Sequence, residues 1–241
     1  MFKFFLPFFL LGSLLIALFI IWRINARKYI SSGTVASAYD AWTQDKLLER
    51  LWGEHIHLGF YPPSKKNIDF RKAKVQFVHE LVKWSGLDQL PKGSTILDIG
   101  CGIGGSSRIL AKYYGFNVIG ITISPAQVKR ARELTPSELN CNFQVMDALD
   151  LKFEDGSFDA VWSVEAGAHM NNKNKFADEM LRILRPGGYL ALADWNSRDL
   201  KANPASFFEK LVLQQLLEQW VHPNFISINE FGNILGTNKH S

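Results

Sequence analysis

The sequence predicts an α/β protein built on a doubly wound parallel sheet. Three observations predict it: short apolar segments alternate with stretches of helical periodicity, turn residues separate them, and a glycine-rich loop joins the first apolar segment to a helix. Strands that alternate with helices pair in parallel, because each helix returns the chain to the same edge of the sheet. With 241 residues, the chain has room for one such domain and additional segments.

Each expected element has a local justification in the spacing of its apolar residues or in the turn that ends it. A helix is expected to begin at Ser124 as the N-cap, with Pro125 and Gln127 at favoured positions, and the helix over 173–184 is expected to end at the turn 185–188. The expected strands are residues 95–99, 117–122, 142–146, 158–164 and 189–194, and the other expected helices are residues 45–51, 69–85, 106–114, 205–220 and, as the start of a further one, 228–235.

The N-terminal residues 1–28 are predicted to form a membrane anchor. Residues 4–22 (FFLPFFLLGSLLIALFIIW) are nineteen residues without a charge, which as a helix would span about 28 Å, close to the hydrocarbon thickness of a bilayer. A cleaved signal peptide and a buried core helix are the competing interpretations. Against a signal peptide, Arg23, Arg27 and Lys28 follow directly and no small-residue cleavage site lies close by. The positive charges after the span predict a single pass with the rest of the chain on the cytoplasmic (or stromal) side.

Charge and cysteine content exclude other classes of protein. The net charge of +4 comes from the residues before Asp40, and the remainder carries 23 Lys and Arg against 23 Asp and Glu. No basic stripe therefore indicates nucleic-acid binding. Two cysteines, Cys101 and Cys141, are too few for a disulfide framework, and no Cys or His spacing predicts a metal site.

The glycine-rich loop carries the most informative motif, Asp98-Ile-Gly100-Cys-Gly102-Ile-Gly104-Gly105. Glycines allow a tight turn and close approach of a ligand to the backbone, and the following helix offers free N–H groups. Taken alone the loop also matches a dinucleotide site. However, the second strand ends in Thr122 rather than in the acid that binds a ribose, and Asp98 would repel a pyrophosphate. An acidic site, with Asp147 after the third strand to accept from an adenine amino group, suits S-adenosyl-L-methionine.

Five segments around this loop carry a family resemblance: ILDIGCGIGG, GITISPAQ, MDALDL, FDAVWSVEAGAHM and LRPGGYLALADW. They resemble the sequential motifs of class I S-adenosylmethionine methyltransferases, which have a Rossmann-like fold. The segments AYDAWTQDKLLERLWGEHIHLGFY and ADWNSRD are similar to the γ-tocopherol methyltransferase group, most of all to the cyanobacterial enzymes that methylate 2-methyl-6-phytylbenzoquinol and solanesylbenzoquinol. The resemblance extends over about residues 38–231, and the N-terminal anchor looks like theirs as well.

The resemblance implies positions for the cofactor. The methionine part would lie against Asp98 and the loop glycines, the ribose beside the end of the second strand, and the adenine beside the end of the third. The implied cofactor-binding residues are Asp98, Gly100, Gly102, Gly104, Thr122, Ile123, Gln127, Asp147 and Ala148. Residues 163–170 would line the methyl-transfer pocket.

Glu165 and His169 are the candidate catalytic residues. They follow the fourth strand, at the carboxyl edge where open α/β sheets bind ligands, and a modest base would help to remove the hydroxyl proton of a hydroquinol. The alternative is a loop-closing pair in which His169 caps the helix that begins near Asn172. His55 and His57 are expected on opposite sides of an extended segment as hydrogen-bonded surface or lid residues, and Trp42, Trp52, Phe60 and Tyr61 as core or pocket cover.

The expected domains are the anchor (residues 1–28), a linker with a helical lid segment (29–90, with 29–37 as a polar linker) and the cofactor-binding domain (91–241). Compared with the family, the last strands of the sheet are missing from this domain. The expected function is membrane-anchored C-methylation of a prenylated benzoquinol in tocopherol and plastoquinone synthesis, with the lipid substrate and the membrane as partners. Another lipid acceptor (a tocopherol, a sterol or a fatty acyl chain) and an inactive cofactor-binding remnant are the alternatives.

Overall fold

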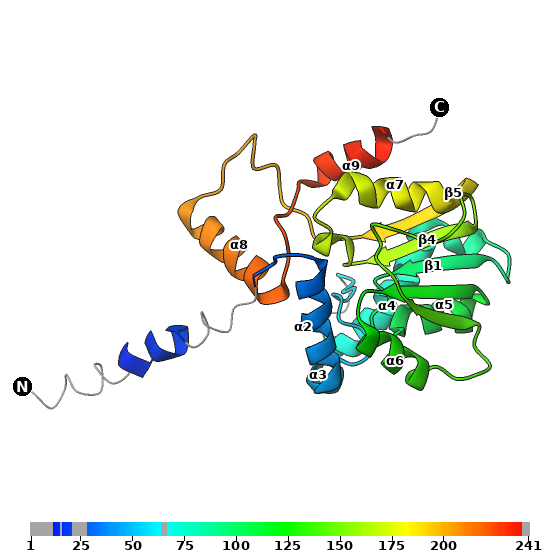
Figure 1. Cartoon of the computed structure of the whole chain (residues 1–241), viewed down its shortest axis with the longest axis horizontal. Helices are drawn as coiled ribbons and strands as arrows, with labels where there is room; N and C mark the ends of the chain where they lie inside the picture. The colour runs from blue at the N-terminus through cyan, green and yellow to red at the C-terminus, as the bar shows by residue number, and fades with distance from the viewer. Residues whose placement is uncertain (1–11, 15, 21–27, 64–66, 238–241) are drawn as a thin grey trace, which may run out of the picture.

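The computed structural model describes residues 12–14, 16–20, 28–63 and 67–237, and it contains the predicted parallel sheet (Figure 1). Within these residues the sheet has five strands in the order β3-β2-β1-β4-β5, and all four pairings are parallel. The strands are β1 (Thr95–Ile99), β2 (Asn117–Thr122), β3 (Cys141–Val145), β4 (Phe158–Val164) and β5 (Leu184–Ala193). The described residues after β5 add no further strand, only an isolated bridge between Ser197 and Ser227.

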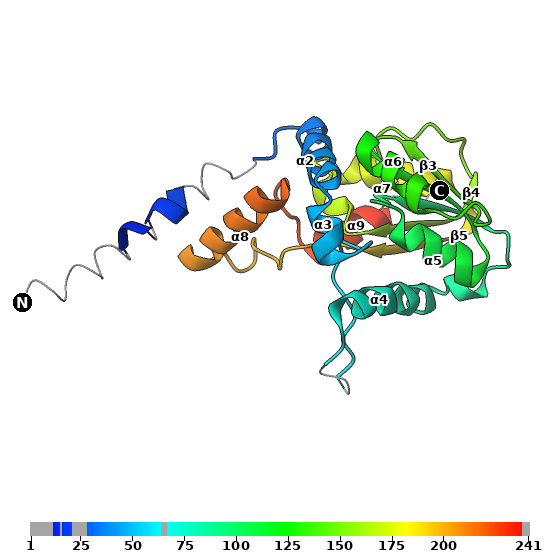
Figure 2. The same ribbon diagram turned by 90° about the horizontal axis from the view of Figure 1, so that it is seen from below.

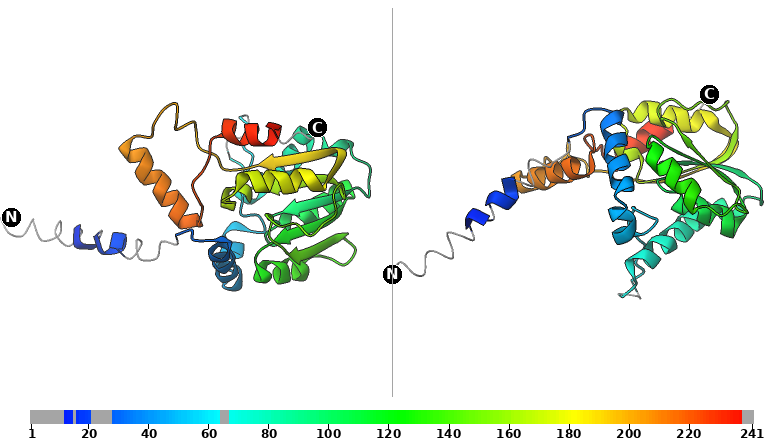
Figure 3. Two further views of the ribbon diagram at one scale, coloured as in Figure 1. Left: turned by 45° about the horizontal axis from the view of Figure 1, so that its top comes forward. Right: turned by 60° about the horizontal axis from the view of Figure 1, so that its bottom comes forward.

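Helices cover both faces of the sheet, as a doubly wound arrangement requires. On one face α4 (Phe70–Ser85) and α5 (Gly105–Tyr114) enclose a core with fully buried Trp162 at its centre. On the other face α7 (Lys173–Ile183) and α9 (Ile228–Thr237) pack over a second core. The right-hand view of Figure 3 shows α4 and α7 on opposite sides of the sheet. Further elements after α4 are α6 (Pro125–Leu134), α8 (Phe207–Trp220), and the short helices η1 (Leu87–Gln89) and η2 (Gly167–His169).

The N-terminal segment differs from its prediction. Residues 29–37 are not a linker: α2 (Ser32–Gln44) begins at Ser32 and is followed by α3 (Leu47–Trp52). The Ser-rich start forms the N-terminal turn of α2, because Thr34 Oγ1 accepts from the Ser31 N–H at 3.4 Å and donates to the Ser31 carbonyl at 2.7 Å. Val35 and Ala38 are buried against Val221, which stabilises the helix.

The turn 185–188 lies inside β5 rather than before it. Leu184 pairs with Phe158, pairing resumes between Tyr189 and Ala160, and the residues between them form an irregularity in which Gly187 has a φ of 76°. A glycine in the left-handed region allows the strand to continue after such a bulge. The strand therefore begins five residues before the expected start.

The predicted transmembrane helix, residues 4–22, lies mostly outside the described residues. Residues 12–14 and 16–20 are helical and expose the large apolar side chains Leu14, Ile16, Leu18, Phe19 and Ile20. Among the residues that the structure describes, none of the helices reaches the length and apolar character that a membrane crossing needs.

Candidate active site

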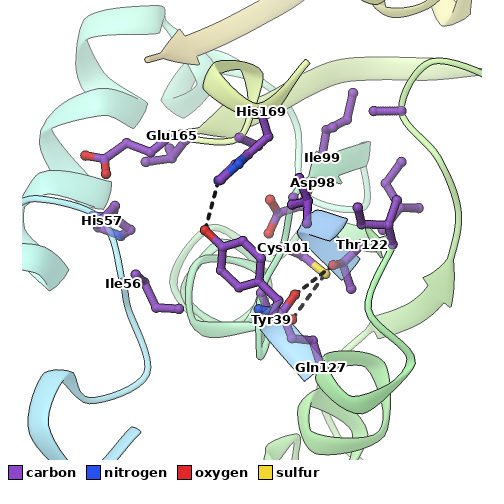
Figure 4. Close-up of a pocket in the computed structure, with 18 of the residues that line it drawn as sticks. Tyr39, Ile56, His57, Asp98, Ile99, Cys101, Thr122, Gln127, Glu165 and His169 are labelled. Carbon is purple, nitrogen blue, oxygen red and sulfur yellow. Dashed lines mark hydrogen bonds between the residues drawn. The ribbon is translucent and has the colours of Figure 1, made fainter. Parts of the chain in front are cut away.

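A pocket of about 280 Å³ opens at the carboxyl ends of the central strands (Figure 4). Its floor is the loop after β1, and its walls come from the ends of β2, β3 and β4, from α2, and from the segment 52–58. Figure 4 shows Asp98, Thr122 and Gln127 at one end and Glu165 at the other, with Tyr39 between them. The pocket therefore has two ends with different chemistry.

The three predicted loop glycines adopt φ values of 74° (Gly100), 55° (Gly102) and 84° (Gly104), which side-chain-bearing residues rarely adopt. They meet different surroundings. A Cβ on Gly100 would lie 2.2 Å from that of Ala166, whereas a Cβ on Gly102 would have only the Gln127 amide nitrogen within 4.0 Å. Gly102 thus presents bare backbone to the pocket. Gly104 does not line the pocket; it is the residue before α5, beside the Phe143 ring.

Asp98 is buried at the end of β1 and lines the pocket floor. Its Oδ2 accepts a hydrogen bond from Ser107 Oγ at 2.5 Å. Burial raises the pKa of Asp98 to about 7, against the opposing effect of the Ser107 bonds. A cation in the pocket would stabilise the carboxylate and lower this pKa. Asp98 is therefore suited to hold an ammonium group.

The predicted ribose-side residues are in contact with one another. Thr122 Oγ1 donates to Gln127 Oε1 at 2.7 Å, and both residues, together with Ile123, line the pocket. Gln127 is positioned by α6, where Ser124 Oγ accepts from the Gln127 N–H at 3.1 Å as the predicted N-cap. Asp40 of α2 fixes the same helix end, because its carboxylate accepts from the Ala126 N–H at 3.0 Å.

The adenine-side residues follow β3. Asp147 and the buried Ala148 both line the pocket, and Asp147 Oδ1 accepts from the Leu149 N–H at 2.9 Å. The two residues thus lie where the resemblance implies contact with an adenine.

The charges of the pocket fit S-adenosylmethionine. Its lining among the described residues includes four carboxylates and neither Lys nor Arg: Glu54, Asp98, Asp147 and Glu165. Phosphate-bearing ligands need positive charge or an unopposed helix N-terminus, whereas a ligand with a sulfonium and an ammonium group is stabilised by carboxylates. The bare backbone at Gly102 and the buried Asp98 agree with that ligand.

Glu165 lies at the other end of the pocket, in the loop after β4. It has a φ of 54°, a left-handed conformation that costs energy for a residue with a side chain and that is common at functional sites. Its Oε1 accepts from the Leu58 N–H at 2.9 Å, so it ties the segment 52–58 to the sheet. Burial raises the pKa of Glu165, while the hydrogen bonds from Leu58 and from the Trp195 side chain and the charge of Lys74 oppose the rise.

His169 contacts α2 rather than the helix that follows it. Its Nε2 lies 2.9 Å from the hydroxyl of Tyr39, and its Nδ1 lies 3.3 Å from the Val221 carbonyl oxygen. Because a carbonyl only accepts, Nδ1 carries the proton and Nε2 accepts from Tyr39. Burial lowers the pKa of His169 to about 4, so the ring is neutral near pH 7.

The alternative role for His169 as a helix cap is wrong. The N-cap of α7 is Asn172, whose side chain accepts from the Lys175 N–H at 2.9 Å. Glu165 and His169 are also not joined by a hydrogen bond in the described network; each contacts a different covering segment, Leu58 and Tyr39 respectively. Asp194, at the end of β5, holds the loop between them by accepting from the Ala168 N–H at 2.9 Å.

His55 and His57 are together, which contradicts their expected placement on opposite sides. His57 Nε2 lies 3.1 Å from His55 Nδ1, and both side chains are buried, because residues 53–60 turn across the pocket instead of extending. Burial lowers their pKa values to about 4 (His57) and about 3 (His55), so both are neutral. Lys74 of α4 holds this segment, since Nζ donates to the carbonyls of His55 at 2.7 Å and Trp52 at 3.2 Å.

Sequence reasoning missed several residues of the site, chiefly Tyr39, Lys74, Trp220 and His222. Their partners are remote in sequence: Tyr39 and His169 are 130 residues apart. Trp220 and His222 line the pocket, and the His222 ring lies 4.2 Å from that of His169. Of the four aromatic residues considered from the sequence, Trp52 lines the pocket, Trp42 packs on Tyr39 and Trp220, and Phe60 and Tyr61 are exposed.

Comparison with known proteins agrees with this geometry. Residues 97–192 match the model of a family described as "Methyltransferase domain". The chain is 59% identical over 217 residues to 2-methyl-6-phytyl-1,4-hydroquinone methyltransferase of Synechocystis sp. The aligned region covers 89% of this chain and 68% of the relative. The chain is 38% identical over 201 residues to the chloroplastic tocopherol O-methyltransferase of Arabidopsis thaliana, covering 78% of this chain and 58% of that protein.

Solved structures share the fold. Geranyl diphosphate C-methyltransferase of Streptomyces coelicolor, crystallised with S-adenosyl-L-homocysteine, superposes with a TM-score of 0.67 over 86% of this chain and 78% of that one, at 21% identity. The sequence identity of 59% to the cyanobacterial relative extends over 68% of that relative's length, and it shows which family the chain belongs to. The chain belongs to the S-adenosylmethionine-dependent methyltransferases of the 2-methyl-6-phytyl-1,4-hydroquinone methyltransferase family.

Proposed function

We propose that the chain is a C-methyltransferase that acts on a ring carbon of a prenylated benzoquinol, in the synthesis of tocopherol and plastoquinone. The observation that carries the proposal is the pocket itself, in which an acidic cofactor end continues into an end that holds Glu165 and the Tyr39–His169 pair. The identity to the cyanobacterial hydroquinone methyltransferase supports the acceptor class. The chain spans 68% of that relative and 58% of the tocopherol O-methyltransferase, so the activity of the whole protein is part of the proposal.

The reaction requires the protein to accept one proton from the acceptor hydroxyl and to exclude water from the pocket. Bound S-adenosylmethionine supplies an electrophilic methyl group. As the acceptor hydroxyl loses its proton, electron density moves into the ring, the ring carbon forms the new C–C bond, and the proton on that carbon leaves afterwards. The net products are the thioether, the methylated quinol and one proton. A base within hydrogen-bond reach that accepts the hydroxyl proton accelerates such a step.

Two groups that line the pocket are candidate proton acceptors. Neutral His169 already accepts from Tyr39, so Tyr39 can take the acceptor proton while it passes its own to His169. Glu165 is the other, because its carboxylate lines the pocket, where it accepts from the Leu58 N–H and from the Trp195 side chain. Trp52, Trp195 and Trp220 line the same end and exclude water from it.

Membrane anchoring is the second part of the proposal. We infer that residues 4–22 cross the bilayer once and that the domain lies on the cytoplasmic (or stromal) side; the uncharged run and the cations that follow it support this inference. A phytyl or solanesyl tail keeps the acceptor in the bilayer, since each buried CH₂ contributes about 0.8 kcal/mol. An enzyme attached to the same membrane meets such a substrate at high effective concentration.

The tocopherol O-methyltransferase relative supports a second candidate, in which the methyl group goes to a tocopherol. The two candidates differ in acceptor and in product. Chromatography and mass spectrometry of the labelled product identify the acceptor that was used and the atom that carries the new methyl group.

The test is incubation of membranes that contain the full chain with radiolabelled S-adenosylmethionine and either quinol lipids or tocopherols. Label in a ring-methylated prenylquinol supports the proposal, and label only in a tocopherol product supports the second candidate. Replacement of Asp98 by Ala should abolish incorporation. Cofactor binding by calorimetry without label in any lipid would identify an inactive remnant and contradict the proposal.

A further inference from the structure

The helix α8 leaves a large apolar surface exposed beside the pocket. Phe207, Phe208 and Val212 have exposed fractions of 71%, 76% and 68%, and Leu211 is also exposed. These positions are adjacent on a helix, because Phe207 and Leu211, and Phe208 and Val212, are each four residues apart. Exposed apolar patches of this kind mark surfaces that contact a partner or a membrane. We call these four residues the α8 face.

The α8 face belongs to a well-formed helix. Ser206 and Glu209 form a capping box, in which the Glu209 N–H donates to Ser206 Oγ at 3.3 Å and the Ser206 N–H donates to Glu209 Oε2 at 2.8 Å. Arg198 holds the same carboxylate at 2.9 Å. The apolar side chains are therefore presented on a defined surface, and Figures 1 and 2 show α8 projecting away from the sheet on the side of the N-terminus.

The opposite end of α8 reaches the pocket and the incoming N-terminal chain. Leu216 and Trp220 line the pocket. Leu217 and Glu218 border a hollow together with Lys28 and Tyr29. The chain thus enters the domain directly beside α8. From Trp22, the end of the apolar run, to Lys28 is a span of at most about 20 Å in a fully extended chain.

This continuity identifies the occupant of the α8 face. We propose that α8 lies on the surface of a lipid bilayer, with Phe207, Phe208, Leu211 and Val212 in its apolar boundary layer; the proposal rests on the membrane anchoring proposed above. The C-terminal end of α8 borders Lys28, which is at most about 20 Å of chain from the proposed membrane-spanning segment, so the helix lies near the bilayer, where an apolar face is stabilised by burial in lipid. Lys210, near the N-terminal end of α8 and beside the α8 face, together with Arg23, Arg27 and Lys28 favours anionic headgroups.

The arrangement gives α8 a role in the path of the acceptor. Its face lies at the membrane, and its last turn lines the pocket. A prenylated quinol can move along the helix from the bilayer to the pocket without passing through water. A second copy of the chain or another protein on the α8 face would not connect the pocket to the membrane, and these occupants are outcomes of the test.

The test places a fluorophore on the α8 face of the full chain, reconstituted into vesicles of equimolar phosphatidylcholine and phosphatidylglycerol. Bimane is attached at Val212→Cys and, as the matched control, at Trp84→Cys, which has an exposed fraction of 78% at the end of α4. Labelling of the unsubstituted chain in parallel accounts for Cys141. We expect acyl-chain-brominated lipids to quench the label at position 212 severalfold more than the label at position 84.

Equal quenching at the two positions would overturn the proposal. It would also be overturned if the emission of the label at position 212 responded to protein concentration in detergent but not to brominated lipid. That result would identify a second copy of the chain on the α8 face. The double variant F207S/F208S should lower the rate on a bilayer-dissolved prenylated quinol about tenfold, keep the affinity for S-adenosylmethionine, and keep the rate on a tail-less quinol in detergent. F207L/F208L should restore the rate. Vesicle flotation tests the anchor separately, and quenching without methyl transfer to any quinol would contradict the proposed function alone.

Discussion

The hydroxyl of Tyr39 lies 2.9 Å from Nε2 of His169, which joins the first described helix of the domain to the loop after β4. Their rings meet edge to face with centroids 5.4 Å apart. Because His169 is neutral and its Nδ1 donates to Val221, the Tyr39 hydroxyl is the group that donates to Nε2. The bond joins two walls of the pocket, and in the proposed mechanism it forms the start of the proton path.

Replacement of Tyr39 by Phe should lower the rate of methyl transfer by about 10²-fold, because the proton path loses its first member while the ring still packs. The affinity for S-adenosylmethionine should change little. Single-turnover kinetics and calorimetry measure the two quantities. Tyr113→Phe, at an exposed position on α5, is the control. An unchanged rate in Tyr39→Phe would leave Glu165 as the group that takes the proton.

Cofactor affinity should depend on pH through Asp98. Its pKa in the free protein is about 7, and a bound cation favours the ionised carboxylate. Below pH 7 a proton must leave before the cation is stabilised, so affinity should fall by about tenfold per pH unit as the pH drops. Above pH 7 the affinity should level off, until the ammonium group of the cofactor loses its own proton at about pH 8. Titration calorimetry across this range measures the effect.

Asp98→Asn should bind the cofactor weakly and without this pH dependence. Asp150→Asn, an exposed carboxylate paired with Lys152, is the matched control and should behave like the original chain. A pH profile that survives in Asp98→Asn would assign the titration to another carboxylate of the pocket.

Gly100→Ala and Gly93→Ala separate crowding from backbone strain. Both glycines have positive φ values, 74° and 88°, but a Cβ at Gly93 would have nothing within 4 Å whereas one at Gly100 would lie 2.2 Å from the Ala166 Cβ. Gly93→Ala should cost about 1 kcal/mol of unfolding free energy. Gly100→Ala should cost clearly more, because the loop after β4 and the loop after β1 must separate. Chemical denaturation measures both; equal losses would show that Ala166 adjusts freely.

Lys74→Met should loosen the segment 52–58. The ammonium group is buried and donates to two carbonyls of that segment, which would lose their partner. We expect faster proteolysis between residues 53 and 60 and faster dissociation of bound cofactor. Lys72→Met, an exposed change on the same helix, is the control. Identical proteolysis in both variants would mean that Gly59 and Phe60 hold the segment by their contacts with Ala73.

The sheet could be predicted from the sequence because local signals define it. The strands β1, β2 and β4 have the expected ends, and β3 is shifted by one residue, since buried apolar runs between turns admit few other interpretations. The predicted cofactor residues line the pocket, apart from Gly104, because they follow the strands at one edge. The sequence after the fifth strand predicts no sixth or seventh strand, and the described residues after β5 form none.

The covering segments could not be predicted because their structure depends on distant contacts. α2 is stabilised by burial of Val35 and Ala38 against Val221, which is remote in sequence. His55 and His57 come together only because the segment 53–60 turns over α5 and α4, and their alternation in sequence suggested an extended chain. Tyr39, the hydrogen-bond partner of His169, could not be predicted for the same reason, because the two residues are 130 positions apart in the sequence.

The close contact at Gly105 has a consequence for turnover. A Cβ there would lie 2.6 Å from the Glu54 carbonyl oxygen and 2.9 Å from the His55 ring, so the covering strap rests on the first turn of α5 without clearance. A ligand that leaves the floor of the pocket on this side requires the segment 52–58 to lift. On that route the release of the demethylated cofactor and the opening of the pocket are one event, and its frequency sets an upper bound on the number of catalytic cycles per second.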